Sequence, residues 1–147
     1  MSKNKKNIGY NSIGWYLRAL GMWMDRQMIQ KLEPFGLTLD QFAIIMILFK
    51  QDRITQVEIG VEAMQPAYAT TRNLDKLESL GYIRRHKHES SRRSHRVMLT
   101  DEGRKLVPAL AEASRSVKES FLLPLEEEQK AGLLKTLSIL SETCLLS

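Results

Sequence analysis

The strongest constraint on the fold is a series of helix start and stop signals in the middle of the chain. Thr38-Leu39-Asp40-Gln41 and Thr55-Gln56-Val57-Glu58 are capping boxes, in which a threonine and a Gln or Glu three residues later bond the N–H groups at a helix start. Pro66 suits the start of another helix, and Gly81 suits a C-terminal cap. The signals predict helices over about 38–50, 55–63 and 66–80. The inward face of the last one is expected to carry Leu74, Leu77 and Leu80.

A strand–turn–strand pattern follows these helices. Residues 82–88 predict a strand, residues 89–95 a polar turn, and residues 96–100 a returning strand. Three short helices followed by a basic hairpin are the order of a winged helix-turn-helix, which we assign to residues 38–100. The predicted fold class is mainly α with a small β-hairpin.

The two ends of the chain are predicted to be long apolar helices. The first runs from about Ile8 to Glu33 and carries two apolar faces, and Pro34 and Gly36 end it. Thr100 is expected to cap a helix that reaches about Leu122, and after Pro124 a last helix starts at residues 126–128. A centre of 63 residues cannot cover these helices. We therefore expect one domain over residues 1–147, in which 8–35 and 101–147 pair with a second copy across a two-fold axis.

The charge of the chain is concentrated in the predicted hairpin. Residues 82–96 carry six Lys and Arg side chains and one acid, so this segment has the same net charge as the whole protein, +5. All three histidines, His86, His88 and His95, lie there as well. A basic segment on a nearly neutral body is typical of a protein that binds a polyanion.

A helix of the length predicted for 66–80 fits the major groove of B-DNA, where its first turns would face base edges. Its early residues and the hairpin supply the candidate DNA contacts. Arg72 could hold guanine through two hydrogen bonds, Lys76 could reach a phosphate, and Arg92 and Arg93 could enter a narrow minor groove. The full candidate set is Pro66, Ala67, Tyr68, Thr70, Thr71, Arg72, Lys76, Arg92, Arg93 and Arg96.

The sequence gives weaker support for metal binding, redox sensing or an effector pocket. The histidines could bind zinc or copper, but only Glu89 accompanies them, so no metal site is predicted. Cys144, the one cysteine, shares an apolar stripe with Leu133, Leu137 and Leu140, which favours a buried thiol over a redox sensor. Aromatic and Met residues of the first helix could line an effector pocket, although core or dimer packing is more typical of such spacing.

Catalysis and a membrane location are not expected. The sequence has no Gly-rich phosphate loop and no nucleophile–base pair, and its acids lie scattered or at helix starts, so we predict neither enzyme activity nor a cofactor. The longest apolar run, Phe42–Phe49, is far shorter than the roughly 20 residues of a membrane span. The N-terminal segment lacks the pattern of a signal peptide. We expect a cytoplasmic protein.

Three stretches together resemble the MarR family of bacterial transcriptional regulators. They are TQVEIG (55–60), TTRNLDKLESLGYIRR (70–85) and RRSHRVMLTDEG (92–103), which are similar in order and spacing to TQ-x-ELA, TR-x-LD-x-LE and DRRA-x-R-x-x-LT of that family. The resemblance extends over nearly the whole chain.

The resemblance implies a recognition helix beginning near Pro66, with Thr71 and Arg72 matching the TR pair of the family and Arg93 matching the wing arginine that enters the minor groove. It also implies a homodimer and, in many relatives, a small-molecule effector. Two positions depart from the pattern. Ser91 stands where the family has Asp and cannot form its ion pair, and Ala69 replaces a Thr or Ser.

These features together predict a dimeric, sequence-specific DNA-binding regulator. The expected mode is repression at a pseudo-palindromic operator, relieved by an effector. Two alternatives remain open at this stage. One is a winged-helix module for a protein or RNA partner, and the other is a DNA binder without sequence preference.

Overall fold

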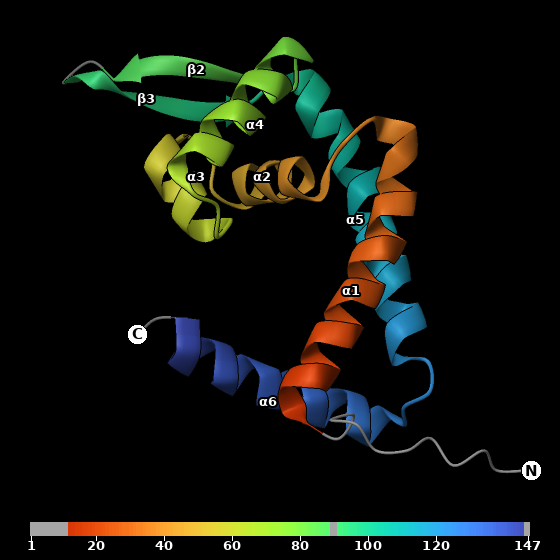
Figure 1. Cartoon of the computed structure of the whole chain (residues 1–147). Coiled ribbons are helices and arrows are strands. Elements are labelled where there is room, and N and C mark those ends of the chain that lie inside the picture. Colours follow the sequence, from red (N-terminus) through yellow and green to blue (C-terminus); the bar gives the residue numbers. More distant parts are fainter. Residues whose placement is uncertain (1–11, 89–90, 146–147) are drawn as a thin grey trace, which may run out of the picture. The chain divides into compact units, whose positions relative to one another are not determined.

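The computed structural model describes residues 12–88 and 91–145, apart from the side chains of 87–88 and 91–94. The chain divides into two compact units, Met1–Ser114 and Arg115–Ser147, and each is described by itself. The first unit holds helices α1 to α4, the sheet and the start of α5 (Figure 1). Mostly helical structure with a small antiparallel sheet confirms the predicted fold class.

The first helix, α1, spans Ile13–Leu32. The predicted start at Ile8 lies outside the described residues. Ser12 is its N-cap, with an extended backbone and a hydroxyl that accepts a hydrogen bond from the Trp15 N–H at 3.1 Å. The short 3₁₀ helix η1, Glu33–Phe35, follows and ends at Gly36, whose φ of 64° is left-handed. The predicted stop at Pro34 and Gly36 is therefore confirmed.

Both predicted capping boxes form in the structure. Helix α2 spans Leu39–Lys50 and is capped by Thr38, and α3 spans Gln56–Glu62 and is capped by Thr55. In each box the hydroxyl accepts from the third helical N–H at 3.2 Å, and that residue's side chain accepts from the cap N–H in return. Helix α4 spans Ala67–Ser79 with Pro66 as its N-cap, and Gly81 follows its end at a φ of 79°.

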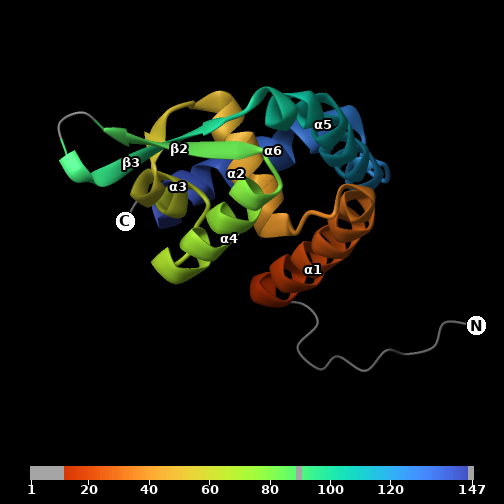
Figure 2. The ribbon, with the colours of Figure 1, turned by 90° about the horizontal axis from the view of Figure 1, so that it is seen from above.

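The sheet has three strands and not the two expected. Strands β2, Ile83–His88, and β3, Ser91–Leu99, form the hairpin, and β1, Ile54–Thr55, adds a short edge in the order β1-β3-β2. The predicted turn over 89–95 is wrong for residues 91–95, because β3 already begins at Ser91, and residues 89–90 lie outside the described part of the chain. Polar residues can lie in a strand here, because the backbone ladder with β2 supplies the pairing. The hairpin extends away from the helices past α3 (Figures 1 and 2).

The core of the first unit lies between the helices and the inner face of the sheet. It is formed by apolar side chains from α2, α3, α4, β2, β3 and α5, among them Ile44, Ile45, Leu48, Ile59, Leu74, Leu77, Ile83, Val97 and Leu110. Leu74 and Leu77 face inward as predicted, but Leu80 is 38% exposed. Leu80 is the C-cap residue of α4, where the chain leaves the helix, so it does not continue the buried face of that helix.

Helix α5 spans Asp101–Leu122 and begins beside the sheet, with Pro108 inside it. The hydroxyl of Thr100 accepts from the Gly103 N–H at 3.1 Å, which confirms the predicted cap. Gly103 packs directly on Tyr82, the residue that leads into β2. An added Cβ there would lie 2.1 Å from the carbonyl oxygen of Tyr82, so only glycine fits this junction.

The last helix, α6, spans Glu127–Leu145, and none of its residues is buried in the single chain. The prediction that Cys144 is a buried thiol is wrong for the single chain, in which this residue is exposed. Helix α1 also exposes large apolar side chains, among them Ile13, Leu17, Leu20, Met22 and Ile29.

Across residues 12–88 and 91–145, no single helix is long and apolar enough to cross a membrane. The segments Ile13–Phe35 and Leu39–Lys50 pass the length and composition test only as a pair, with a 79° bend between them.

Candidate nucleic-acid interface

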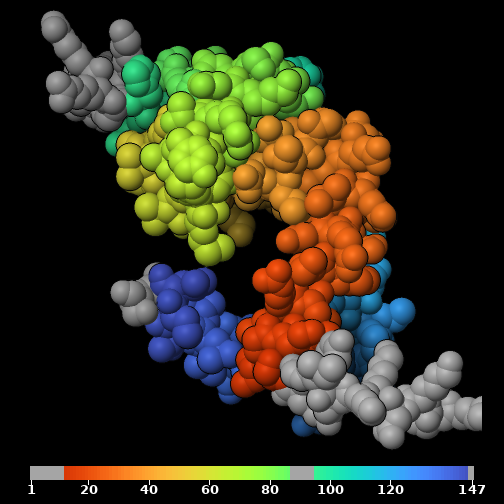
Figure 3. Space-filling model, in the orientation of Figure 1, coloured from red at the N-terminus to blue at the C-terminus, as the bar shows by residue number. Residues whose placement is uncertain are grey.

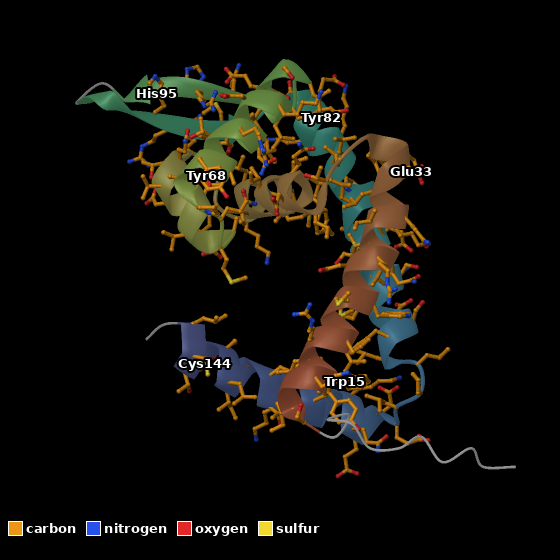
Figure 4. The ribbon with its side chains drawn as sticks, in the orientation of Figure 1. Trp15, Glu33, Tyr68, Tyr82, His95 and Cys144 are labelled. Carbon is orange, nitrogen blue, oxygen red and sulfur yellow. The ribbon has the colours of Figure 1, made fainter. Side chains whose placement is uncertain are left out.

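Helix α4 presents most of the predicted contact residues on its outer face. Pro66, Ala67, Tyr68, Thr71, Arg72 and Lys76 are all exposed. Tyr68, at 75% exposure, lies at the N-terminal end of the helix (Figure 4). The structure therefore places an aromatic ring, a hydroxyl and two cations along the outer face of α4, from Tyr68 in the first turn to Lys76 in the last.

Thr70 is the exception, and its predicted exposure is wrong. It is 1% exposed, and its hydroxyl donates to the carbonyl oxygen of Pro66 at 3.1 Å. Thr70 lies four residues before Leu74 and seven before Leu77, which places it on the buried face of the helix. A Cβ at Gly60 of α3 would lie 2.9 Å from the Thr70 hydroxyl oxygen, so the glycine makes room for this buried threonine.

Gln56 was not among the predicted contacts, yet it belongs to this surface. Its side-chain amide donates to the hydroxyl of Thr71, which in turn donates to the carbonyl oxygen of Ala67 at 3.0 Å. Helices α3 and α4 form one continuous surface in the space-filling view (Figure 3). The capping box predicts where α3 starts, but it gives no reason to assign a role to Gln56.

A polar cluster holds the start of α4 against α2. The side-chain amide of Asn73, a buried residue, donates to the Gln65 side-chain oxygen at 3.2 Å and to the Asp40 carboxylate at 3.5 Å. Gln65 donates in turn to the backbone carbonyl of Asp40 at 3.2 Å. These bonds fix the turn between α3 and α4, and with it the direction in which α4 leaves that turn.

Arg85 joins the hairpin to the same helix. Its guanidinium bonds Asp75 and Glu78 of α4 at 2.7 Å each, while its own side chain is only 19% exposed. Two charge-assisted bonds from one planar group fix geometry as well as energy. Arg85 therefore acts as a structural link between β2 and α4, and its charge is compensated by two acids.

Arg96 lies in the middle of β3, opposite Thr55 of β1 and His86 of β2. It is half-buried, and its guanidinium donates to the backbone carbonyl of Arg53 at 2.8 Å. Arg53 is in the left-handed region, with a φ of 62°. Arg96 therefore supports the loop before β1, away from the tip of the hairpin.

Arg92 and Arg93 lie on the backbone of β3 at the start of the strand, near the tip. Their side chains, like those of His88 and Ser91, lie outside the described residues. His86 pairs with Arg96 and His95 pairs with Lys87, so His86 and His95 occupy opposite faces of the ribbon. His95 lies toward the tip, as Figure 4 marks. In the part of the chain that the structure describes, no group of three His, Cys, Asp or Glu residues could hold a metal ion.

One carboxylate at the interface has a shifted pKa. The pKa of Glu58 is lowered below its ordinary 4.5. The main cause is the hydrogen bond that its carboxylate accepts from the Thr55 N–H, and the Thr55 hydroxyl and the charge of Arg96 act in the same direction. This carboxylate therefore stays ionised at neutral pH as part of the cap.

A surface hollow of about 470 Å³ lies between α3 and α4. Its lining is mostly apolar and includes Val57, Val61 and Met64, each about three-quarters exposed. Apolar surface thus continues from α3 toward the outer face of α4.

Comparisons with known proteins agree with this architecture. The MarR family model matches residues 37–95. The regulator PecS of Dickeya dadantii is 29% identical over 120 residues, which are 80% of this chain and 72% of that protein. A MarR transcriptional regulator from Methanosarcina mazei has a TM-score of 0.84 at 29% identity, over 89% of this chain and 94% of that one. The transcriptional repressor CouR, solved on a 23-mer DNA duplex, has a TM-score of 0.80 at 26% identity, over 94% and 99%.

The family model covers most of the winged-helix segment, and the solved structures extend the match over both end helices. The resemblance read from the three sequence stretches is confirmed: residues 37–95 match the MarR family model, and the relatives found here are helix-turn-helix transcriptional regulators.

Proposed function

We propose that this protein is a dimeric regulator of transcription that binds DNA by sequence, with α4 in the major groove and the β2–β3 hairpin at an adjacent minor groove. The observation that carries the proposal is the outer face of α4. Tyr68, Thr71, Arg72 and Lys76 are exposed on it, next to a hairpin whose sequence is strongly basic. Side chains of these types read base edges and hold phosphates.

The roles divide by chemistry. Arg72 is the candidate reader of guanine, and Lys76, one turn further along, is the candidate phosphate contact. Arg92 and Arg93 are the candidates for the minor groove. Of the predicted set, Thr70 drops out because it is buried, and Arg96 contributes through the loop that it supports.

A homodimer would bring two such helices to one duplex. The support is the large apolar surface that the single chain exposes on α1 and on α6. Each Å² of apolar surface that is buried contributes roughly 25 cal/mol, so burial of these faces against a second copy favours association. A two-fold dimer predicts half-sites one helical turn apart on a pseudo-palindrome. Sedimentation should give twice the monomer mass, and Leu137→Glu on α6 should lower it.

Within this account, regulation is repression by occupation of the promoter, relieved by a small-molecule effector. CouR, a repressor solved on DNA, supports the first part at 26% identity. A promoter–reporter assay tests the sign of regulation. Loss of the gene should raise expression from a repressed promoter and lower it from an activated one.

The decisive test of sequence-specific binding is selection from a random duplex library at about 150 mM salt, followed by titration of the best site against a scrambled one. We expect a pseudo-palindrome that binds roughly a thousandfold more tightly. Equal binding to both duplexes would instead identify a DNA binder without sequence preference. Binding to neither would favour a module for a protein or RNA partner.

A further inference from the structure

The hydroxyl of Thr71 is held by two partners from within the protein. A threonine hydroxyl has one hydrogen to donate and two lone pairs that accept. The carbonyl oxygen of Ala67 can only accept, so the bond between them at 3.0 Å uses the hydrogen of Thr71. This leaves the hydroxyl oxygen with acceptor capacity alone.

Gln56 occupies part of that remaining capacity. Because the hydrogen of Thr71 points to Ala67, Gln56 must present its N–H₂ group, which is the atom that the structure places against the Thr71 oxygen. The capping box at Thr55 fixes the start of α3 and thereby the position of Gln56. One lone pair on Thr71 remains for an outside donor.

We infer that Gln56 fixes Thr71 as a hydrogen-bond acceptor, so that Thr71 selects a base with an exocyclic amino group in the major groove. The inference rests on the proposed function and names the chemistry that one residue of that site reads. In the major groove only the N6 amino group of adenine and the N4 amino group of cytosine are donors. Guanine and thymine offer Thr71 no donor there.

The same argument removes phosphate as the partner of Thr71. Phosphate oxygens only accept hydrogen bonds, and the one hydrogen on this hydroxyl is already donated within the helix. If its hydrogen were not donated to Ala67, the threonine hydroxyl could turn and donate that hydrogen to a phosphate oxygen or to guanine. The bond to Ala67 and the N–H donated by Gln56 together favour the orientation in which the hydrogen points to Ala67.

The test uses the site selected by the full-length protein and asks which base position responds to Thr71→Val. At that position the amino group alone is then removed, with purine in place of adenine or pyrimidin-2-one in place of cytosine. The wild-type protein should lose about twofold to tenfold in affinity, the range of one neutral hydrogen bond. Thr71→Val should bind both duplexes equally, and Thr71→Ser should restore the difference.

Gln56→Met tests the positioning role. It should weaken the preference for the amino base, and it should add nothing in the Thr71→Val background. Gln51→Met, at the end of α2, is the matched control and should leave the preference unchanged. A structural effect of Gln56 alone would lower affinity for every duplex by the same factor.

Two results would overturn the inference alone. One is wild-type binding that ignores removal of the amino group, and the other is a guanine or thymine at the position that Thr71→Val changes. Failure to select any sequence would refute the proposed function and the inference together.

Discussion

Gly103→Ala gives the sharpest prediction of stability. The new Cβ would lie 2.1 Å from the carbonyl oxygen of Tyr82 and 3.0 Å from its carbon. That carbonyl cannot turn away, because it accepts the N–H of Thr100 at 3.0 Å. To remove this clash, β2 and α5 must move apart by about 1 Å. We therefore expect overpacking to lower the free energy of unfolding by about 3 kcal/mol, which is near the upper end of its usual range. Alanine recovers about 1 kcal/mol of helix propensity, so the net loss is about 2 kcal/mol.

Urea unfolding at one fixed protein concentration measures this loss. With a slope of about 2 kcal/mol per M, the midpoint should fall by about 1 M. Gly21→Ala is the matched control, since Gly21 is exposed within α1 and no atom lies within 4 Å of its added Cβ. It should raise stability by about 0.5–1 kcal/mol. Equal midpoints for Gly103→Ala and wild type would refute the contact between α5 and β2.

Three further substitutions test other parts of the account. Arg85→Met removes both bonds to Asp75 and Glu78, so it should cost about 1–2 kcal/mol in urea unfolding after allowance for the exposed acids, and it should weaken DNA binding. An unchanged midpoint would show that Arg85 does not hold β2 to α4. Thr70→Ala should cost about 1–2 kcal/mol but leave the selected DNA sequence unchanged, and an altered sequence would contradict its burial. The lowered pKa of Glu58 predicts a contribution to stability that is complete above pH 4.5 and lost as the pH falls through that lowered pKa. In Glu58→Gln the free energy of unfolding should therefore fall less steeply as the pH is lowered below 4.5, and a slope equal to that of the wild type would assign the loss of stability to other carboxylates.

The helices of the winged-helix segment could be predicted because their boundaries are set by local bonds. Thr38 and Thr55 satisfy free N–H groups within their own first turns, and Gly36 and Gly81 supply left-handed ends. No distant contact is needed to place any of these signals. This explains why three consecutive helices could be located from the sequence within a residue or two.

The incorrect predictions concern features that depend on contacts between distant parts of the chain. Strand β1 has two residues and forms only because β3 pairs with it, so no local sequence pattern predicts this strand. Leu80 fits the spacing of Leu74 and Leu77, but the helix ends before it can turn inward. Cys144 follows an apolar stripe that the single chain leaves exposed.

The candidate site divides in the same way. The exposed positions of α4 follow from helical periodicity, and so does the burial of Thr70, which shares a face with Leu74 and Leu77 and occupies the space that Gly60 leaves in α3. The bonds of Gln56 to Thr71 and of Arg85 to Asp75 and Glu78 join separate elements. Residue type and spacing could not indicate these pairings, because each depends on how the two elements pack.

The central claim is that the exposed face of α4 reads DNA sequence, and Arg72 tests it most directly. Selection from the random duplex library is repeated with Arg72→Ala beside the wild-type protein at the same salt concentration. The account predicts that one guanine, repeated symmetrically in the two half-sites, loses its preference by roughly fivefold to 150-fold, the equivalent of about 1–3 kcal/mol, while the other positions keep theirs. An identical selected sequence with uniformly weaker binding would contradict the claim and make Arg72 a phosphate contact.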